Sequence, residues 1–114
     1  METEEINKEN FQEIVVAPGV PTVVDFWGPQ CARCFALMPV IEGLIAEKEG
    51  KIRLFKIDAS KNRRLCINLR LMSLPSFLFY KDGKEVARLA GDSVTPGDLR
   101  SSVERLLAGP GGAP

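Results

Sequence analysis

The sequence of 114 residues contains no histidine and only three cysteines, Cys31, Cys34 and Cys66. Histidine is the usual general base near neutral pH and a common metal ligand, so its absence excludes triad hydrolases and histidine-bound metal sites. Three cysteines cannot complete a four-cysteine zinc site within one chain, and we predict no metal and no organic cofactor. Any proton transfer must therefore use carboxylates, thiols or water.

The chain also lacks an excess of charge of one sign and any long hydrophobic run. Fifteen basic residues balance fifteen acidic ones, which argues against nucleic-acid binding. No stretch approaches the roughly 18 apolar residues that span a bilayer, and the acidic start of the chain does not resemble a secretory signal. Together with the odd cysteine count, these features predict a monomer in a reducing cytoplasm that binds neither nucleic acid nor membrane.

What is present is an alternation of strand and helix patterns, which is typical of an α/β sheet with crossover helices. At 45% hydrophobic and 26% charged residues, the composition suits one globular domain. We place this domain at residues 1–108 and expect the tail at 109–114, which is rich in glycine and proline, to be disordered. The spacing of apolar residues predicts helices at 6–16, 32–48, 61–68 and 95–108, and strands at 22–27, 52–57, 76–80 and 84–89.

Three local motifs sharpen this pattern. The sequence Lys81-Asp82-Gly83 between two strand patterns predicts an antiparallel hairpin. The sequence Thr95-Pro96-Gly97-Asp98 has the residues of a capped helix N-terminus, with Thr95 as the N-cap. Pro39 lies inside the second predicted helix, where its ring predicts a kink.

The strongest chemical signal is Cys31-Ala32-Arg33-Cys34, which follows a predicted buried strand and opens a helix. The first turn of a helix offers unpaired amide donors and the positive end of its dipole, and both favour a thiolate on Cys31. Cys34 lies one turn further along on the same side, close enough for disulfide exchange. The motif therefore predicts a redox dithiol in which Cys31 attacks and Cys34 resolves.

Arg33, between the two cysteines, has two interpretations. A fixed cation there favours the thiolate and stabilises the reduced form relative to the disulfide, which makes the couple more oxidising. In the other interpretation, the side chain points into solvent and changes little.

The run from Val24 to Cys34, with Pro39 five residues later, resembles the active-site segment of the thioredoxin family. Leu74-Pro75-Ser76 resembles the second signature of that family, and Gly83 and Gly91 match further positions. The resemblance covers residues 6–108. It implies a thioredoxin-like α/β fold, with a central mixed sheet of four to five strands flanked by about four helices.

Within this resemblance, Asp25 matches the buried acid that assists proton transfer at the resolving cysteine. A carboxylate inside an apolar strand should have a raised pKa through desolvation, which suits proton exchange near neutral pH. The alternative is a structural aspartate bonded to the backbone. Leu54 takes the position of the family's nearby lysine, with Lys56 two residues along the strand, so we expect Asp25 to lack a cation.

The resemblance also implies a substrate groove beside the dithiol. Pro75 is expected to be cis and to face the dithiol, which leaves the backbone of Leu74 free to pair with an extended substrate peptide. An ordinary edge-strand proline is the alternative. Trp27 matches a tryptophan that packs beside the disulfide, although it could also be ordinary core. Gln30 replaces an aromatic that helps to dock substrates, and Gly91 is included among the substrate-binding residues.

The segment that follows the second predicted strand carries the third cysteine and several cations. Cys66 is expected to be a small buried hydrophobe, with regulatory oxidation or a dimer disulfide as alternatives. Arg63, Arg64 and Arg70 form either a solvated face or a docking patch for an acidic partner.

These features together predict a protein disulfide reductase. Its substrates are proteins that contain disulfides, and Cys31, Cys34 and Asp25 are the catalytic residues. The resemblance implies that a flavoprotein of the thioredoxin-reductase type restores the dithiol. The alternatives are a more oxidising oxidase or isomerase, a binding module with this fold but no turnover, and a metal or iron–sulfur site shared by two chains.

Overall fold

The computed structural model describes residues 3–17 and 19–108, so that Pro18 and the predicted disordered tail at 109–114 lie outside the described residues. The described residues form five strands, four α-helices and one short 3-10 helix. In chain order these elements are β1 (Glu4–Ile6), α1 (Lys8–Val16), β2 (Thr22–Trp27), α2 (Ala32–Ala46), β3 (Arg53–Asp58), η1 (Ala59–Lys61), α3 (Arg63–Asn68), β4 (Ser76–Lys81), β5 (Lys84–Ala90) and α4 (Pro96–Leu106).

The five strands form one mixed sheet in the order β1-β3-β2-β4-β5. The strands β1, β3 and β2 are parallel, whereas β4 is antiparallel to β2 and β5 is antiparallel to β4. The central strand β2 consists largely of β-branched and aromatic residues, as expected of a strand covered on both faces. The expected α/β fold, with four to five strands and about four helices, is confirmed.

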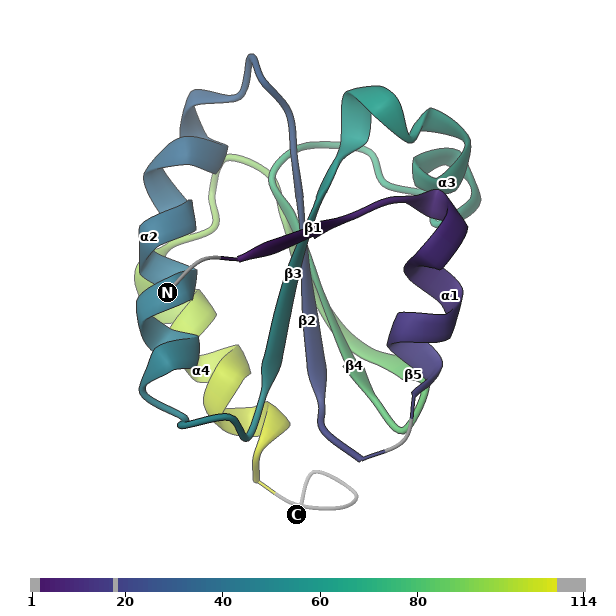
Figure 1. Cartoon of the computed structure of the whole chain (residues 1–114). Helices are drawn as coiled ribbons and strands as arrows, with labels where there is room; N and C mark the ends of the chain where they lie inside the picture. The colour runs from purple at the N-terminus through teal and green to yellow at the C-terminus, as the bar shows by residue number, and fades with distance from the viewer. Residues whose placement is uncertain (1–2, 18, 109–114) are drawn as a thin grey trace.

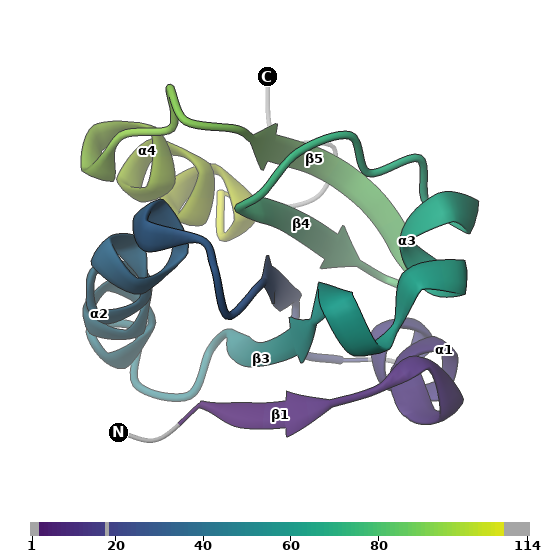
Figure 2. The same ribbon diagram turned by 90° about the horizontal axis from the view of Figure 1, so that it is seen from above.

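Helices cover both faces of the sheet, with α2 and α4 on one face and α1 and α3 on the other (Figure 1). The view from above shows the same three layers (Figure 2). Alternate residues of β2 therefore enter different cores: Val23 packs in the cluster with α2 and α4, and Val24 packs in the cluster with α1. Asp25, two residues after Val23, faces the α2 side of the sheet.

The N-terminal segment differs from the prediction. The predicted helix at 6–16 begins at Lys8, and the residues before it form the edge strand β1, which is parallel to β3. Asn7 separates the two elements, because its side chain accepts hydrogen bonds from the backbone N–H groups of Glu9 and Asn10. A strand of three residues is too short to show alternation, so Ile6 fitted the helical spacing equally well.

The hairpin and the helix cap predicted in the C-terminal half are confirmed, whereas the helix predicted at 61–68 begins at Arg63, after the short 3-10 helix η1. The strands β4 and β5 form a hairpin, with positive φ angles of 52° at Asp82 and 80° at Gly83. The Thr95 hydroxyl accepts from the N–H of Asp98, whose carboxylate accepts from the N–H of Thr95, so the N-terminus of α4 is capped from both sides. In the N-terminal half, the helix α2 continues through Pro39 to Ala46, and the kink at Pro39 stays a prediction. Within the part of the chain that the structure describes, no helix has the length and apolar character needed to cross a membrane.

Candidate active site

Cys31 and Cys34 stand where β2 leads into α2. Cys31 is the N-cap of α2, and its Sγ accepts a hydrogen bond of 3.1 Å from the backbone N–H of Cys34. The two residues are joined by a disulfide, with their Cα atoms 5.2 Å apart. Cys31 is half-buried, whereas only 1% of Cys34 is exposed. The helix N-terminus therefore presents an amide donor to the sulfur that a target can reach.

Asp25 lies in the middle of β2 and is fully buried on the face that packs against α2. Neither carboxylate oxygen has a hydrogen-bond partner among the described residues, so the structure does not show the alternative of an aspartate bonded to backbone. Burial is the main reason that the pKa of Asp25 is raised from 3.8 to about 7. A carboxyl group with this pKa can both accept and release a proton at neutral pH.

The expected lack of a cation near Asp25 is wrong. The strands β2 and β3 pair so that Asp25 lies opposite Lys56, while Leu54 lies opposite Val23. Residues that lie opposite each other in paired strands point to the same face, and the charge of Lys56 lowers the pKa of Asp25. The expectation placed the lysine position two residues too early because the register between two strands cannot be read from either strand alone.

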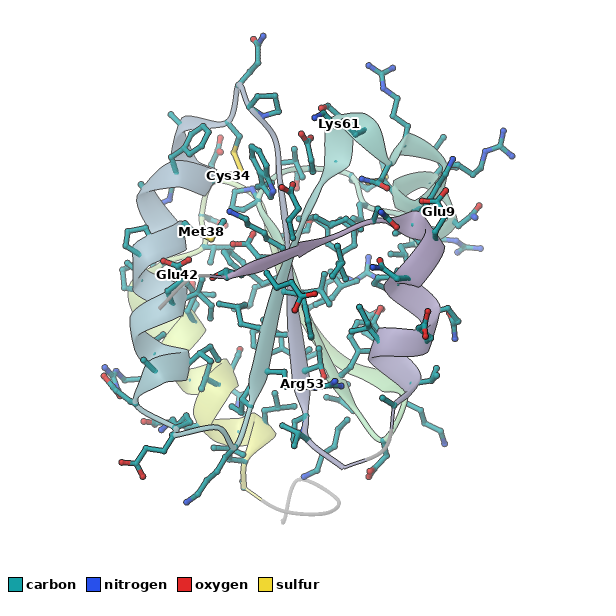
Figure 3. The ribbon with its side chains drawn as sticks, viewed as in Figure 1. Glu9, Cys34, Met38, Glu42, Arg53 and Lys61 are labelled. Carbon is teal, nitrogen blue, oxygen red and sulfur yellow. A yellow bond between two sulfur atoms is a disulfide. The ribbon has the colours of Figure 1, made fainter. Side chains whose placement is uncertain are left out.

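Glu42 is a second carboxylate near Asp25 that the sequence reasoning missed. It follows Cys34 and Met38 along one side of α2, as Figure 3 shows. Its carboxylate accepts a hydrogen bond from the hydroxyl of Thr3, a buried residue just before β1. Its negative charge raises the pKa of Asp25. The spacing of four residues between Cys34, Met38 and Glu42 was the signal that could have identified it.

Trp27 ends β2 beside the first turn of α2. The centroids of the Trp27 and Phe35 rings are 5.9 Å apart, and the Nζ of Lys56 lies 6.0 Å from the Trp27 centroid. Trp27 is half-buried and lies outside both core clusters, and 55% of Phe35 is exposed. The two rings form an aromatic surface next to the dithiol, and Phe35 was not among the predicted site residues.

Arg33 does not point into solvent. Its Nη2 donates a hydrogen bond of 2.6 Å to the carbonyl oxygen of Val94, and its Nε is buried without a partner among the described residues. This bond joins the first turn of α2 to the loop between β5 and α4. The predicted effect of the Arg33 charge on the Cys31 thiolate stays a prediction.

The loop before β4 brings together the predicted residues at positions 74, 75 and 91. The peptide bond between Leu74 and Pro75 is cis, and the carbonyl oxygen of Pro75 accepts a hydrogen bond of 2.9 Å from the N–H of Gly91. Gly91 has a φ of +94°, a conformation that favours glycine. The side chain of Leu74 lies against Gly28, where an added Cβ would be 3.0 Å from Leu74 Cδ1.

An open cavity of about 530 Å³ lies beside Cys31, and we call it the near cavity. Of the predicted substrate-binding residues, Gln30 and Leu74 line it, whereas Trp27, Pro75 and Gly91 lie outside its lining. The lining residues are Gly28, Pro29, Gln30, Cys31, Ala59, Ser60, Arg63 and Leu74. The accessible cysteine thus faces a hollow with room for part of another molecule.

The comparison with known families agrees with this geometry. The family model described as Thioredoxin matches residues 2–105. The chain belongs to the thioredoxin family. It is 36% identical over 105 residues to the thioredoxin of Peptoclostridium acidaminophilum, a match that covers 91% of each chain. It is 31% identical over 103 residues to the thioredoxin of Acetoanaerobium sticklandii, covering 90% of this chain and 98% of the relative.

A third thioredoxin is longer than this chain. The M-type chloroplastic thioredoxin of Spinacia oleracea is 32% identical over 107 residues, which cover 94% of this chain and 59% of the relative. This chain therefore matches about three fifths of the length of that relative. Membership of the thioredoxin family, together with the paired Cys31 and Cys34, makes the protein a thiol–disulfide oxidoreductase of the thioredoxin type, with disulfide-containing substrates.

The third cysteine of this thioredoxin-family protein lies apart from the dithiol. Cys66 is a free, half-buried thiol on α3, with its Sγ 4.0 Å from the carbonyl oxygen of Ala59. Burial raises the pKa of the Cys66 thiol. Among residues 3–17 and 19–108, no group of three or more cysteine, histidine or acidic residues is placed to hold a metal ion. The absence of a metal cofactor stays a prediction.

Proposed function

We propose that this protein reduces disulfide bonds of target proteins with the dithiol of Cys31 and Cys34. The observation that carries the proposal is the position of Cys31. Its sulfur accepts the N–H of Cys34 at the start of α2, opens into the near cavity, and is joined to a buried partner cysteine. This arrangement supports one attacking and one resolving sulfur.

The reaction begins with the Cys31 thiolate, which attacks one sulfur of the target disulfide. A mixed disulfide forms between Cys31 and the target, and the other target sulfur leaves as a thiolate that takes up a proton. The thiol of Cys34 then loses its proton to the Asp25 carboxylate and attacks the Cys31 sulfur. The second target sulfur leaves and is protonated, so the target gains two electrons and the Cys31–Cys34 disulfide remains.

The burial of Asp25 supports its part in the second step. Asp25 lies on the face of β2 that packs against α2, the helix that carries Cys34. With a pKa of about 7, its ionised form can accept the proton of Cys34 and later return it to solvent. In a chain without histidine, this carboxyl is the group best suited to that exchange.

Each turnover leaves the dithiol oxidised, so two electrons must return before the next one. We propose a flavoprotein of the thioredoxin-reductase type as the donor, on the strength of the family. A cytoplasmic, monomeric protein without metal or organic cofactor stays a prediction from the sequence. Polyanions and membranes are not among the partners that we propose.

The test is reduction of the insulin disulfides with dithiothreitol as the electron source. We expect the protein to accelerate the reduction and Cys31→Ser to leave only the uncatalysed rate. A wild-type rate no higher than dithiothreitol alone would overturn the proposed function and favour a binding module. Equilibration of the Cys31–Cys34 couple with glutathione would then show its net direction, since a couple more oxidising than glutathione would favour oxidase or isomerase activity.

A further inference from the structure

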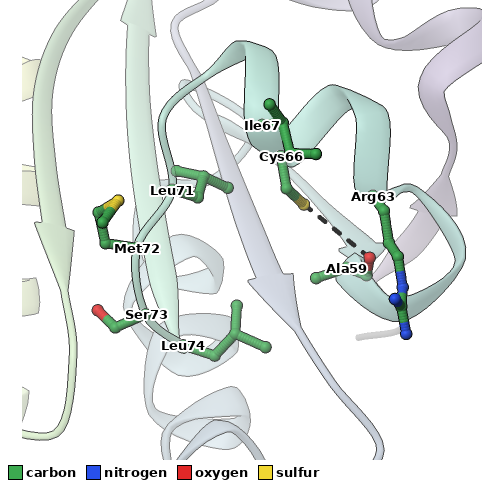
Figure 4. Close-up of a pocket in the computed structure, with 8 residues that line it drawn as sticks. All are labelled: Ala59, Arg63, Cys66, Ile67, Leu71, Met72, Ser73 and Leu74. Atoms are coloured by element: carbon green, nitrogen blue, oxygen red, sulfur yellow. Dashed lines mark hydrogen bonds between the residues drawn. The ribbon is translucent and has the colours of Figure 1, made fainter.

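A second cavity adjoins the near cavity. It has a volume of about 310 Å³ and lies between α3 and the chain segment at 71–74, and we call it the far cavity (Figure 4). Three residues line both cavities: Ala59, Arg63 and Leu74. The two cavities therefore form one continuous groove from Cys31 to α3, which we call the α3 groove.

The far cavity is apolar, and the residues at its border are unusually exposed. Its lining includes Cys66, Leu71 and Leu74, and two further apolar residues flank it. Met72 is 91% exposed and Ile67 is 69% exposed. Single exposed apolar side chains are common in proteins, but here two of them border the same cavity. A ligand side chain that entered the cavity would cover apolar surface and bury its own.

One cation lines the α3 groove, because Arg63 belongs to the lining of both cavities. The segment at 61–70 contains Lys61, Arg63, Arg64 and Arg70 and no acidic residue, although the whole chain has no net charge. All four side chains are exposed, and none of them forms an ion pair with a described residue. The positive charge of Arg63 within the lining favours a ligand that carries a carboxylate.

We propose that the α3 groove selects substrates: it binds the polypeptide next to the target cysteine when that polypeptide carries an apolar side chain and an acidic side chain. The apolar side chain enters the far cavity between α3 and residues 71–74, and the acidic side chain lies against Arg63. This specificity rests on the proposed function, because the near cavity must receive the target disulfide at Cys31.

Continuity and size favour a polypeptide as the occupant. The chain on one side of the target cysteine must leave the near cavity, and the far cavity shares three lining residues with it. An extended chain advances about 3.3 Å per residue, so a few residues span adjoining cavities. The far cavity, at about 310 Å³, is at the small end of ligand sites and suits one or two side chains.

Binding can be measured without any turnover, because Cys66 lines the far cavity and is the only free thiol of the oxidised protein. The probes are cysteine-free peptides with one leucine and one glutamate at varied spacing, and matched peptides with serine for leucine or lysine for glutamate. We expect the leucine–glutamate peptides to slow alkylation of Cys66 by iodoacetamide in a saturable manner. Equal protection by the serine peptides, or none by any peptide, would overturn the proposal.

Turnover measurements test whether the preference for an apolar side chain also applies to the reduction of disulfides by the dithiol. The substrates are symmetric disulfides of cysteine peptides with leucine at the second to sixth residue on either side of the cysteine, and a small neutral disulfide serves as the reference. Ile67→Ser is expected to lower kcat/KM about tenfold for the best leucine peptide, because apolar contact area is lost, and to leave the small disulfide unchanged. Val86→Ser, at an apolar residue on β5 that is 55% exposed, is the matched control and should change neither.

The charge of Arg63 is tested by a separate pair of variants. Arg63→Glu is expected to lower kcat/KM for glutamate peptides about threefold to tenfold at low salt, and the effect should shrink as salt is added. Arg105→Glu, at an exposed residue on α4, makes the same change of charge away from the groove and should have a much smaller effect. Equal effects of the two variants would contradict a role for Arg63 in binding the acidic side chain.

The outcomes separate this proposal from the proposed function. Failure to reduce even the small disulfide would overturn the proposed function, whereas reduction of all peptides at the same rate would overturn only the groove specificity. A second copy of the chain is the other occupant that the assay can detect. A concentration-dependent dimer in analytical ultracentrifugation that Ile67→Ser abolishes would assign the groove to self-association and overturn the proposal.

Discussion

The helices α2 and α3 both place a cysteine in the α3 groove, but they give the two sulfurs different surroundings. Cys31 caps α2, a helix of 15 residues, and its sulfur accepts the Cys34 amide. Cys66 lies within α3, a helix of six residues whose N-cap residue, Asn62, makes no side-chain hydrogen bond to the first turn of the helix. Its sulfur is near a carbonyl oxygen, and burial raises its pKa. The position of a thiol on a helix therefore decides whether it is suited to attack.

The largest effect should come from removing the sulfur of Cys31, and removal of the Cys66 sulfur is the comparison. Cys31→Ser removes the attacking thiolate, and insulin reduction should fall to the rate of dithiothreitol alone. Cys66→Ser should retain activity on insulin within about twofold, since its half-buried thiol takes no part in the exchange. An inactive Cys66→Ser protein that is still folded by circular dichroism would show that Cys66 also takes part in the reaction.

The next largest effect concerns the carboxyl beneath α2. The folded protein holds a proton on Asp25 up to a pKa of about 7, whereas the unfolded chain releases it near 3.8, so stability should fall as pH rises between these values. Each pKa unit is worth about 1.4 kcal/mol, so Asp25→Asn should raise the free energy of unfolding at pH 8 by about 4 kcal/mol. The gain should nearly vanish towards pH 4 in guanidinium titrations of the oxidised protein.

Asp58, at the end of β3 before α3, provides the matched control. It is also buried, but its Oδ1 accepts hydrogen bonds from the backbone N–H and the hydroxyl of Ser60. Asp58→Asn weakens these bonds and should not stabilise the protein at pH 8. If Asp58→Asn and Asp25→Asn gave the same gain at pH 8, the surroundings of Asp25 would not be the cause.

A smaller effect is expected in the rates at which the thiols react. In the reduced protein at pH 7, iodoacetamide should alkylate Cys31 at least about tenfold faster than Cys66, because only a thiolate reacts and α2 stabilises that of Cys31. Mass spectrometry of peptides from a time course measures both rates in one sample. Similar rates would mean that the helix N-terminus does not activate Cys31.

The smallest effect should come from the cation on each helix. Arg33→Ala removes the hydrogen bond to Val94, and the free energy of unfolding should fall by about 1 kcal/mol. Arg64→Ala, at an exposed arginine of α3, should leave stability unchanged within about 0.5 kcal/mol. The pKa of Cys31, measured by alkylation in the same variants, should rise only in Arg33→Ala. No rise would show that Arg33 holds the loop but does not tune the dithiol.

Much of the fold could be predicted because its signals are local. The hairpin turn at Asp82 and Gly83 and the cap at Thr95 each need only neighbouring residues, and both are confirmed. The edge strand β1 was missed because its three residues are held by pairing with β3, which lies far along the chain. Ile6 has the same apolar character in a strand or a helix, so no local rule separates the two.

The candidate site likewise has local features that could be predicted and contacts between separate elements that could not. The dithiol and Asp25 could be predicted because they follow each other along β2 and α2. Three contacts could not be predicted, because each joins separate elements. They are the pairing of Lys56 opposite Asp25, the proximity of Glu42 to Asp25, and the hydrogen bond from Arg33 to Val94. Such contacts depend on strand register and helix packing, and these are properties of the assembled core.

Three features follow from the order of the residues alone: a dithiol opens a helix, a carboxylate lies within an apolar strand, and no histidine is available for proton transfer. Three others depend on the folded chain: the burial of Asp25, the charges that surround it, and the place of the second cavity beside Cys66. The physical reason is that motifs act over a few bonded residues, whereas pKa values and cavities arise from groups that folding brings together through space.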